Sequence, residues 1–249
     1  EQLQILSDQL FEANEKLKGL DKLKSEFLSL AAHQLRSPLT AMKGYASMVV
    51  EGSYGEINPQ AKDAVERIFQ ASKNLGKVVE DLLDVSKIEQ GGMKFVMEPF
   101  SLVEIASDMA KDLSITADKR GLKVNFESDS ADLCMVNGDK EKLRQVVLNF
   151  IDNSIKYTKE GTINVSVKRD KNKVLFRVKD TGMGMTPEIK ASLFQKFARG
   201  DGARMNTTGS GLGLYLAKEI VSAHKGEVMV DSEGPGKGST FGMDLDAIQ

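Results

Sequence analysis

The sequence predicts two parts of different fold class: an all-α helical hairpin, followed by an α+β sandwich in which helices are layered on a mixed sheet. Up to Gly91, apolar residues recur at alternating steps of three and four, as in long packed helices. Beyond Gly92, short segments that alternate apolar and polar residues are interspersed with helical patterns. A chain of 249 residues is long enough for two domains, each with its own core.

The first predicted helix carries a heptad pattern typical of a coiled coil. Its seam consists of Leu3, Leu6, Leu10, Ala13, Leu17, Leu20, Lys24, Phe27 and Ala31. Extending the count places Gln34 on the seam and His33 on its flank. We therefore expect the imidazole of His33 to face outward rather than into a core.

A second helix follows the turn-like sequence G-S-Y-G-E-I-N-P and repeats the same spacing. Its stripe consists of Ala61, Val65, Ile68, Ser72, Leu75, Val79 and Leu82. A hairpin of two helices cannot fully bury two apolar stripes by itself, whereas two copies related by a two-fold axis form a four-helix bundle. The sequence therefore predicts a homodimer built on this bundle.

The second half mixes both periodicities. A strand-like K-F-V-M-E-P-F leads into a capping-box pattern, Ser101 to Glu104, that opens a helix. Further strands are expected at 163–167, 174–178, 226–230 and 239–245, and further helices at 139–157 and 211–224.

The composition excludes several classes of partner. With 41% hydrophobic and 28% charged residues and a net charge of −2, the chain has no basic surface for nucleic acid or an anionic membrane. The single cysteine, Cys134, lies in the apolar L-C-M-V, which predicts a buried thiol in a reducing compartment. No apolar run reaches the ~18 residues of a membrane span, and no signal peptide is found.

The chain begins without Met, inside a helical pattern. We therefore expect a cytoplasmic piece of a longer protein. A missing N-terminal part would be its only connection to a membrane.

The segment N-F-I-D-N-S-I-K-Y, residues 149–157, falls on a predicted helix. Asn149, Asn153 and Lys156 are four and three residues apart and share one face, beside Tyr157. Amide oxygens suit Mg²⁺, and an ammonium group neutralises phosphate. The alternative is an ordinary solvated face.

The segment D-T-G-M-G, residues 180–184, directly follows a predicted strand. Gly182 and Gly184 allow a ligand to approach the backbone closely, and Asp180 can accept a hydrogen bond from an amine such as N6 of adenine. An ordinary turn is the alternative.

The segment G-S-G-L-G-L, residues 209–214, precedes a predicted helix, where free N–H groups can bind phosphate. No strand precedes these glycines, and G-x-x-x-x-G-K-[ST] is absent, so neither a dinucleotide-binding unit nor a P-loop is indicated.

Together with H-Q-L-R-S-P-L at 33–39, these segments resemble the catalytic region of two-component sensor histidine kinases, and the resemblance covers essentially the whole chain. The pair Phe194 and Phe197 and the closing G-K-G-S-T-F at 236–241 add to it. The resemblance implies a Bergerat-type ATP-binding fold, ATP and Mg²⁺ as cofactors, and the receiver domain of a response regulator as partner.

The resemblance also implies a domain order. It places a coiled-coil signal helix at 1–24, a dimerisation and histidine-phosphotransfer domain at 25–92, and an ATP-binding catalytic domain at 93–249.

By this resemblance, His33 is the phospho-acceptor, which attacks the γ-phosphorus of ATP and passes the phosphoryl group to an aspartate of a response regulator. Asn153, with Asn149 near it, would hold Mg²⁺. The implied nucleotide contacts are Asn149, Asn153, Lys156, Tyr157, Asp180, Gly182, Gly184, Phe197, Arg199, Gly209, Ser210, Gly211, Leu212, Gly213 and Thr240.

Three further expectations come with it. The segment from about 198 to 209 would form a mobile lid, with Arg199 as its phosphate contact. Pro38 would loosen the helix just past the acceptor. His224, at a helix end, matches no acceptor motif and is interpreted as structural or as a C-terminal cap.

The chain departs from the family pattern at two catalytic positions, with Gln34 where an acidic residue is usual and Ser37 where Thr or Asn is usual. Glutamine cannot take up a proton, so slow autophosphorylation and weak phosphatase activity are expected. A dimeric nucleotide-binding scaffold without turnover remains the alternative. An ATPase of the chaperone or topoisomerase type is disfavoured, because those proteins place no histidine box on a dimerising hairpin.

Overall fold

The structure is a computed structural model that describes residues 2–198 and 210–248. It divides into two compact units, Glu1–Met93 and Lys94–Gln249. Among the described residues, no helix has both the length and the apolar character needed to cross a membrane.

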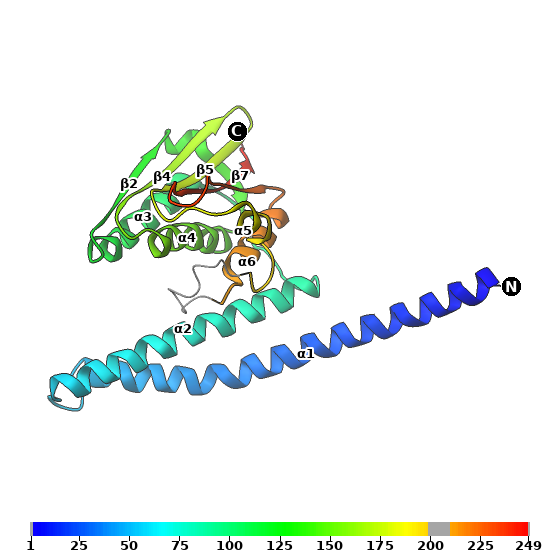
Figure 1. Ribbon diagram of the computed structural model, residues 1–249, viewed down its shortest axis with the longest axis horizontal. Coiled ribbons are helices and arrows are strands. Elements are labelled where there is room, and N and C mark those ends of the chain that lie inside the picture. Colours follow the sequence, from blue (N-terminus) through cyan, green and yellow to red (C-terminus); the bar gives the residue numbers. More distant parts are fainter. Residues whose placement is uncertain (1, 199–209, 249) are drawn as a thin grey trace. The chain divides into compact units, whose positions relative to one another are not determined.

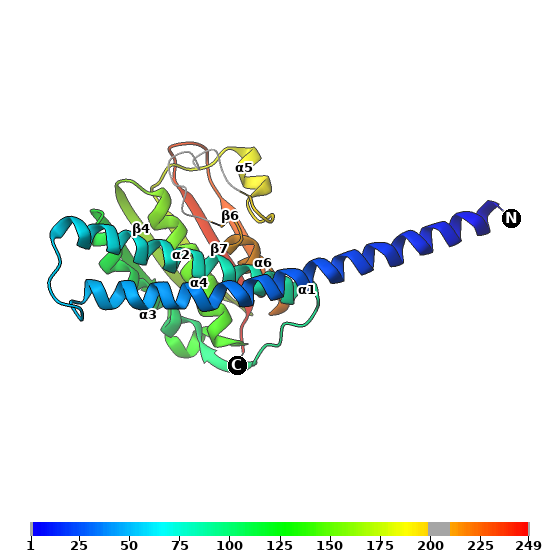
Figure 2. The same ribbon diagram turned by 90° about the horizontal axis from the view of Figure 1, so that it is seen from below.

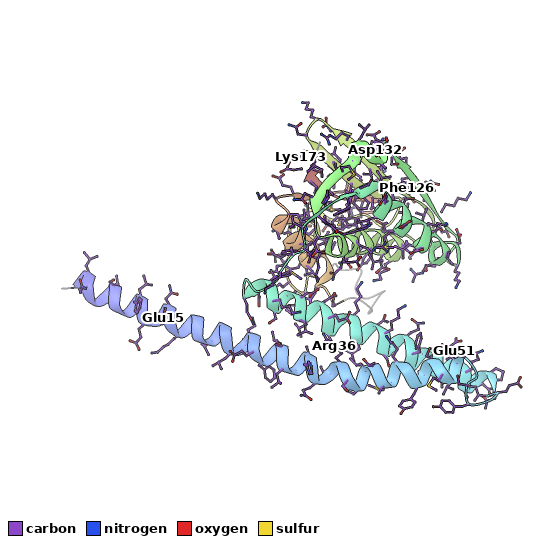
Figure 3. The ribbon with its side chains drawn as sticks, turned by 180° about the vertical axis from the view of Figure 1, so that it is seen from behind. Glu15, Arg36, Glu51, Phe126, Asp132 and Lys173 are labelled. Carbon is purple, nitrogen blue, oxygen red and sulfur yellow. The ribbon has the colours of Figure 1, made fainter. Side chains whose placement is uncertain are left out.

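The first unit is a hairpin of two helices, α1 (Gln2–Val50) and α2 (Pro59–Glu89), as expected (Figure 1). The Asn58 side chain caps the N-terminus of α2 by accepting the Ala61 N–H at 2.8 Å, and Pro59 occupies the first turn. The N-terminal part of α1 extends beyond α2 (Figure 2). Glu15 projects from this extension (Figure 3).

The two helices pack along a line that differs from the heptad seam. Ala32 and Leu39 of α1 form a buried cluster with Val79 and Leu83 of α2. The seam positions Leu3, Leu6, Leu10, Leu20 and Phe27 instead remain 63–86% exposed in the single chain. The hairpin contact uses Ala32 and Leu39, each one residue after a seam position. Leu3, Leu6 and Leu10 lie in the part of α1 that extends beyond α2 (Figure 2), so they have no partner within the described hairpin.

The predicted stripe of α2 divides in the same way. Ser72 and Val79 are buried, whereas Ile68 and Leu75 are 52% and 48% exposed. These two pairs alternate along the helix at steps of three and four, so they lie on neighbouring but distinct lines. One line packs within the hairpin and the other is left uncovered.

Pro38 does not interrupt α1, which continues to Val50. Proline removes the hydrogen bond that its N–H would donate to the carbonyl of Gln34, and its ring crowds that carbonyl, yet the helix continues on both sides. The Thr40 hydroxyl adds a hydrogen bond to the carbonyl oxygen of Arg36 at 2.9 Å. The expected loosening does not appear as a break in the helix.

The second unit is an α/β sandwich. Its elements are β1 (Glu98–Ser101), α3 (Leu102–Asp118), β2 (Leu122–Ser128), η1 (Ala131–Cys134), β3 (Met135–Gly138), α4 (Lys140–Tyr157), β4 (Gly161–Asp170), β5 (Lys173–Asp180), α5 (Pro187–Ser192), α6 (Gly213–Ala223), β6 (Glu227–Asp231) and β7 (Ser239–Asp246). The main sheet has the order β2-β4-β5-β7-β6, and only its β2–β4 pair is parallel. This confirms the mixed sheet.

Helices α3, α4 and α6 pack on one face of this sheet. Phe150 of α4 stacks on Phe176 and Phe241 of the sheet, with ring centroids 6.3 and 6.1 Å apart. The opposite face carries ion pairs such as Lys168–Glu127. Burial on one face only explains the period-two alternation of the strands.

Some local details differ from the sequence expectations. Strands β2 and β3 and helix α5 had no counterpart in the predicted elements. Ser101 does precede α3, but its hydroxyl donates to the carbonyl oxygen of Ala131 at 3.1 Å instead of capping the helix. Cys134 is buried, as expected.

Candidate nucleotide site and phospho-acceptor histidine

His33 lies on α1 with an exposed side chain, directly after the buried Ala32. Gln34 and Ser37 are also exposed. The prediction that the imidazole faces outward is confirmed. Its neighbour packs in the hairpin, so a rigid helix face presents the ring to solvent.

The two asparagines of α4 have different environments. Asn149 is buried, and its Nδ2 donates to the carbonyl oxygen of Gly213 at the start of α6, at 3.2 Å. Asn153, one turn further on, is partly exposed, and no hydrogen bond to its side chain is found among the described residues. The amide of Asn149 therefore connects two helices, whereas the amide of Asn153 is available to a ligand.

Lys156 and Tyr157 end the same helix. The Lys156 ammonium forms an ion pair with Asp152 at 2.6 Å, and both side chains are about one-third exposed. Tyr157 is 40% exposed, and its carbonyl oxygen accepts the Met183 N–H at 3.1 Å. The end of α4 is thus bonded to the loop that follows β5.

Asp180 is the last residue of β5, and only 3% of its surface is exposed. Its Oδ1 accepts the backbone N–H groups of Gly182 at 2.8 Å and Ser239 at 3.1 Å. Its Oδ2 accepts the Ser154 hydroxyl at 3.3 Å. Burial raises the pKa of Asp180 above its usual value, and these three hydrogen bonds oppose the rise.

The loop after Asp180 is held against the glycine-rich turn before β7. Gly238 N–H donates to the carbonyl oxygen of Gly182 at 3.1 Å, and Gly236 N–H to that of Met183 at 2.6 Å. A side chain at Gly182 would place its Cβ 2.5 Å from the Tyr157 carbonyl oxygen. Only glycine fits there. The two hydrogen bonds hold the loop at 180–184 against the glycine-rich turn at 236–238.

The second glycine-rich segment leads directly into α6, which begins at Gly213. The Ser210 hydroxyl accepts the Leu212 N–H at 3.2 Å. Gly211 has a positive φ of 71°, and a Cβ there would lie 2.9 Å from the Cα of Phe197. Phe197 is therefore adjacent to this segment, and its side chain is 63% exposed.

Two predicted contacts, Arg199 and Gly209, lie outside the described residues, as does the lid proposed between about 198 and 209, apart from its first residue. Gly184 has a positive φ of 64° and packs against Gly234. It belongs to the loop after Asp180.

Thr240 is not placed beside Asp180. In the pairing of β5 with β7, Asp180 lies opposite Ser239, and Thr240 lies opposite the exposed Lys179. Successive residues of a strand face opposite sides, so Thr240 points away from the helices. The role of Thr240 in nucleotide binding stays a prediction that this register does not support, whereas Ser239 lies beside Asp180.

Sequence reasoning missed two residues at this site, Ser154 and Ser239. The alternation that places Phe241 in the core also places Ser239 on the inner face, so this signal was present. For Ser154, the one-residue offset from Asn153 gave no indication of a contact with a residue 26 positions away.

Two family comparisons agree with this division of the chain. Residues 23–91 match the family described as "His Kinase A (phospho-acceptor) domain". Residues 138–249 match the family described as "Histidine kinase-, DNA gyrase B-, and HSP90-like ATPase". His33 lies in the first match, and all the polar site residues of the second unit lie in the other.

Curated relatives align over nearly the whole chain. The circadian input-output histidine kinase CikA of Synechococcus elongatus is 31% identical over 97% of this chain. The signal transduction histidine-protein kinase BarA of Escherichia coli K12 is 30% identical over 97%. The chain spans 33% and 26% of the lengths of these relatives.

Solved structures show the same architecture. The full-length kinase ShkA, crystallised with AMPPNP, is 25% identical and matches 90% of this chain and 46% of its own with a TM-score of 0.74. The nucleotide-free catalytic domain of the histidine kinase ThkA matches 62% of this chain and 98% of its own, at 25% identity and a TM-score of 0.53.

An exposed histidine on a helical hairpin and a buried aspartate beside an asparagine-bearing helix thus occur in the two segments that match these families. The chain belongs to the two-component sensor histidine kinases and comprises their catalytic region.

Proposed function

We propose that the chain is an ATP-dependent protein-histidine kinase that phosphorylates His33 and then transfers the phosphoryl group to an aspartate of a response regulator. The observation that carries this proposal is the exposed imidazole of His33 within the segment that matches the phospho-acceptor family. A neutral imidazole nitrogen is a competent nucleophile toward phosphorus.

The second unit supplies groups that fit ATP. Asp180 is a buried acceptor suited to the amino group of a base, and α6 begins at Gly213 after a glycine-rich segment, where backbone N–H groups favour phosphate. The protein named above that was crystallised with AMPPNP shares this fold.

Asn153 fits a magnesium ligand, because its partly exposed amide has no partner among the described residues. Bound Mg²⁺ would neutralise charge on the triphosphate. Asn149 is a weaker candidate, since its Nδ2 already donates to α6. Lys156 could contribute positive charge by exchanging Asp152 for phosphate.

We further propose a division of labour along the chain. Residues 1–24 would transmit a signal as a coiled coil, 25–92 would dimerise and carry the acceptor, and 93–249 would bind ATP. The uncovered apolar line of α2, Ile68 and Leu75, supports dimerisation, because a second copy would bury it in a four-helix bundle.

Labelling with γ-labelled ATP tests the kinase proposal. We expect an acid-labile, base-stable label that His33→Ala abolishes. Nucleotide affinity should be unchanged, because residue 33 belongs to the first unit and the proposed nucleotide contacts all belong to the second. Label that persists in His33→Ala would contradict the acceptor assignment. ATP binding with no label in the wild type would favour a nucleotide-binding scaffold.

Sedimentation of the whole chain tests the dimer. We expect Leu75→Asp to produce monomers at micromolar concentration, since it places a charge on the uncovered line. Lys73→Asp adds the same group at an exposed polar site of the same helix and should leave the dimer intact. Monomeric wild type would contradict the proposal.

A further inference from the structure

The carboxylate of Asp180 has nearly all of its acceptor capacity filled. An ionised carboxylate offers about four lone-pair positions, two on each oxygen. Oδ1 receives two backbone N–H groups, from Gly182 at 2.8 Å and from Ser239 at 3.1 Å. Oδ2 receives the Ser154 hydroxyl at 3.3 Å. Within the described residues, one position remains open, and it is on Oδ2.

The donors that occupy the other three positions differ in kind. The N–H groups of Gly182 and Ser239 belong to the backbone, so every residue type other than proline keeps them. Among the described residues, the Ser154 hydroxyl is the one side-chain donor to this carboxylate, and Ser154 has no exposed surface. Since Oδ1 is anchored by backbone, Ser154 decides how Oδ2 is oriented and occupied.

We propose that Ser154 is a positioning residue for base selection: by donating to Oδ2 of Asp180, it leaves a single acceptor facing the ligand and so selects purines with an amino group at position 6. This inference rests on the proposed function, in which Asp180 contacts the base of ATP. Ser154 acts through Asp180 and is assigned no contact with the reacting phosphate.

The chemical consequence is a preference that depends on the direction of one hydrogen bond. Adenine presents an N–H donor at position 6, whereas hypoxanthine presents an oxygen acceptor there. A buried carboxylate oxygen facing another acceptor leaves both groups unpaired, and sites of this kind discriminate strongly. ATP and inosine triphosphate therefore differ at position 6 of the purine, the group expected to face the open lone-pair position of Oδ2.

Replacing Ser154 by alanine removes the donor, and water that enters the base site would then hydrogen-bond to Oδ2 in its place. A water can rotate, so it can donate to Oδ2 and also donate toward an acceptor on the base. The site would then tolerate either base. Selectivity, rather than folding or phosphate binding, is what the hydroxyl is expected to control.

The same helix end offers a matched control in Thr158. Its hydroxyl oxygen is buried and has no hydrogen-bond partner in the described part of the chain. Thr158→Val therefore deletes a buried hydroxyl next to the same loop without removing a bond to Asp180.

The experiment measures the affinities of the whole chain for ATP and for inosine triphosphate, by competition with a fluorescent ATP analogue. Wild type should prefer ATP by about 10²-fold or more. Ser154→Ala should weaken ATP binding by roughly threefold to tenfold and lower the ATP-to-inosine preference by at least as much. Ser154→Cys, a weaker donor, should give an intermediate preference. Thr158→Val should leave both values at the wild-type level.

Asp180→Asn tests the contact between residue 180 and the base separately from the role of Ser154. Its amide oxygen can keep both backbone N–H groups while its NH₂ group faces Ser154 and the base, so preference should move toward inosine triphosphate. An unchanged preference in Ser154→Ala, or an equal loss of both affinities, overturns the role of Ser154 even if Asp180→Asn behaves as expected. A wild type that binds neither nucleotide contradicts the proposed function itself and the inference with it.

Discussion

The Nε2 atom of His224 accepts the backbone N–H of Asp139 at 2.8 Å, across 85 residues of sequence. Its Nδ1 lies 2.7 Å from the carbonyl oxygen of Ile220, which assigns the ring proton to Nδ1. Asp139 in turn caps α4 by accepting the Lys142 N–H at 3.0 Å. The end of α6 is thereby joined to the beginning of α4, the helix that carries the asparagines of the site.

His224→Ala should destabilise the second unit by about 2–4 kcal/mol, because it leaves the Asp139 N–H without its acceptor and opens a cavity. His33→Ala, which truncates an exposed ring, should change the free energy of unfolding by less than about 0.5 kcal/mol. Urea unfolding followed through the second unit measures both. Equal effects of the two substitutions would show that the buried contacts of His224 contribute nothing.

Because burial raises the pKa of Asp180, the free energy of unfolding should depend on pH. A carboxyl whose pKa is higher in the folded state stabilises the fold most below its usual value, near 3.8, and loses that contribution as pH rises through the folded pKa. Asp180→Asn abolishes this titration.

In the absence of nucleotide, the stability of Asp180→Asn relative to wild type should therefore increase from pH 3.8 upward and level off above the folded pKa. Chemical unfolding at a series of pH values measures the difference. A difference that is constant with pH would contradict the raised pKa.

Asn153→Ala should weaken magnesium-dependent nucleotide binding by roughly 10- to 100-fold, which is the loss expected for a hydrogen bond or ligand to a charged group. The fold should be unaffected, because alanine is a better helix former than asparagine. Calorimetric titration with and without Mg²⁺ measures the effect. Asn164→Ala, which removes an exposed amide from β4, is the matched control and should bind normally.

Gln34→Glu should raise the single-turnover rate of His33 phosphorylation at saturating ATP, with little change in nucleotide affinity. A carboxylate beside the imidazole can accept a proton and stabilise developing positive charge, and such assistance contributes up to about 10²- to 10⁴-fold. Gln60→Glu adds the same charge at an exposed position of α2 and should have no effect. Rates that agree between wild type and Gln34→Glu would show that another group handles the proton.

The sequence alone determined the two classes of fold, the outward position of His33 and the three polar or glycine-rich motifs, because each depends on local periodicity or on residue type at short spacing. The exposure of His33 agrees with the count along one helix, although the hairpin packs through Ala32 and Leu39 and not through the counted seam. The buried Cys134 follows from its apolar neighbours.

Tertiary structure decided what depends on pairing between distant segments. The register of β5 with β7 placed Ser239 beside Asp180 and turned Thr240 away, and no local pattern near Asp180 specifies that register. The division of the α2 stripe into a buried and an uncovered line depends on where α1 packs. The contact between Ser154 and Asp180 arises because α4 packs on β5, so the donors that complete the carboxylate could be recognised only once both elements were in place.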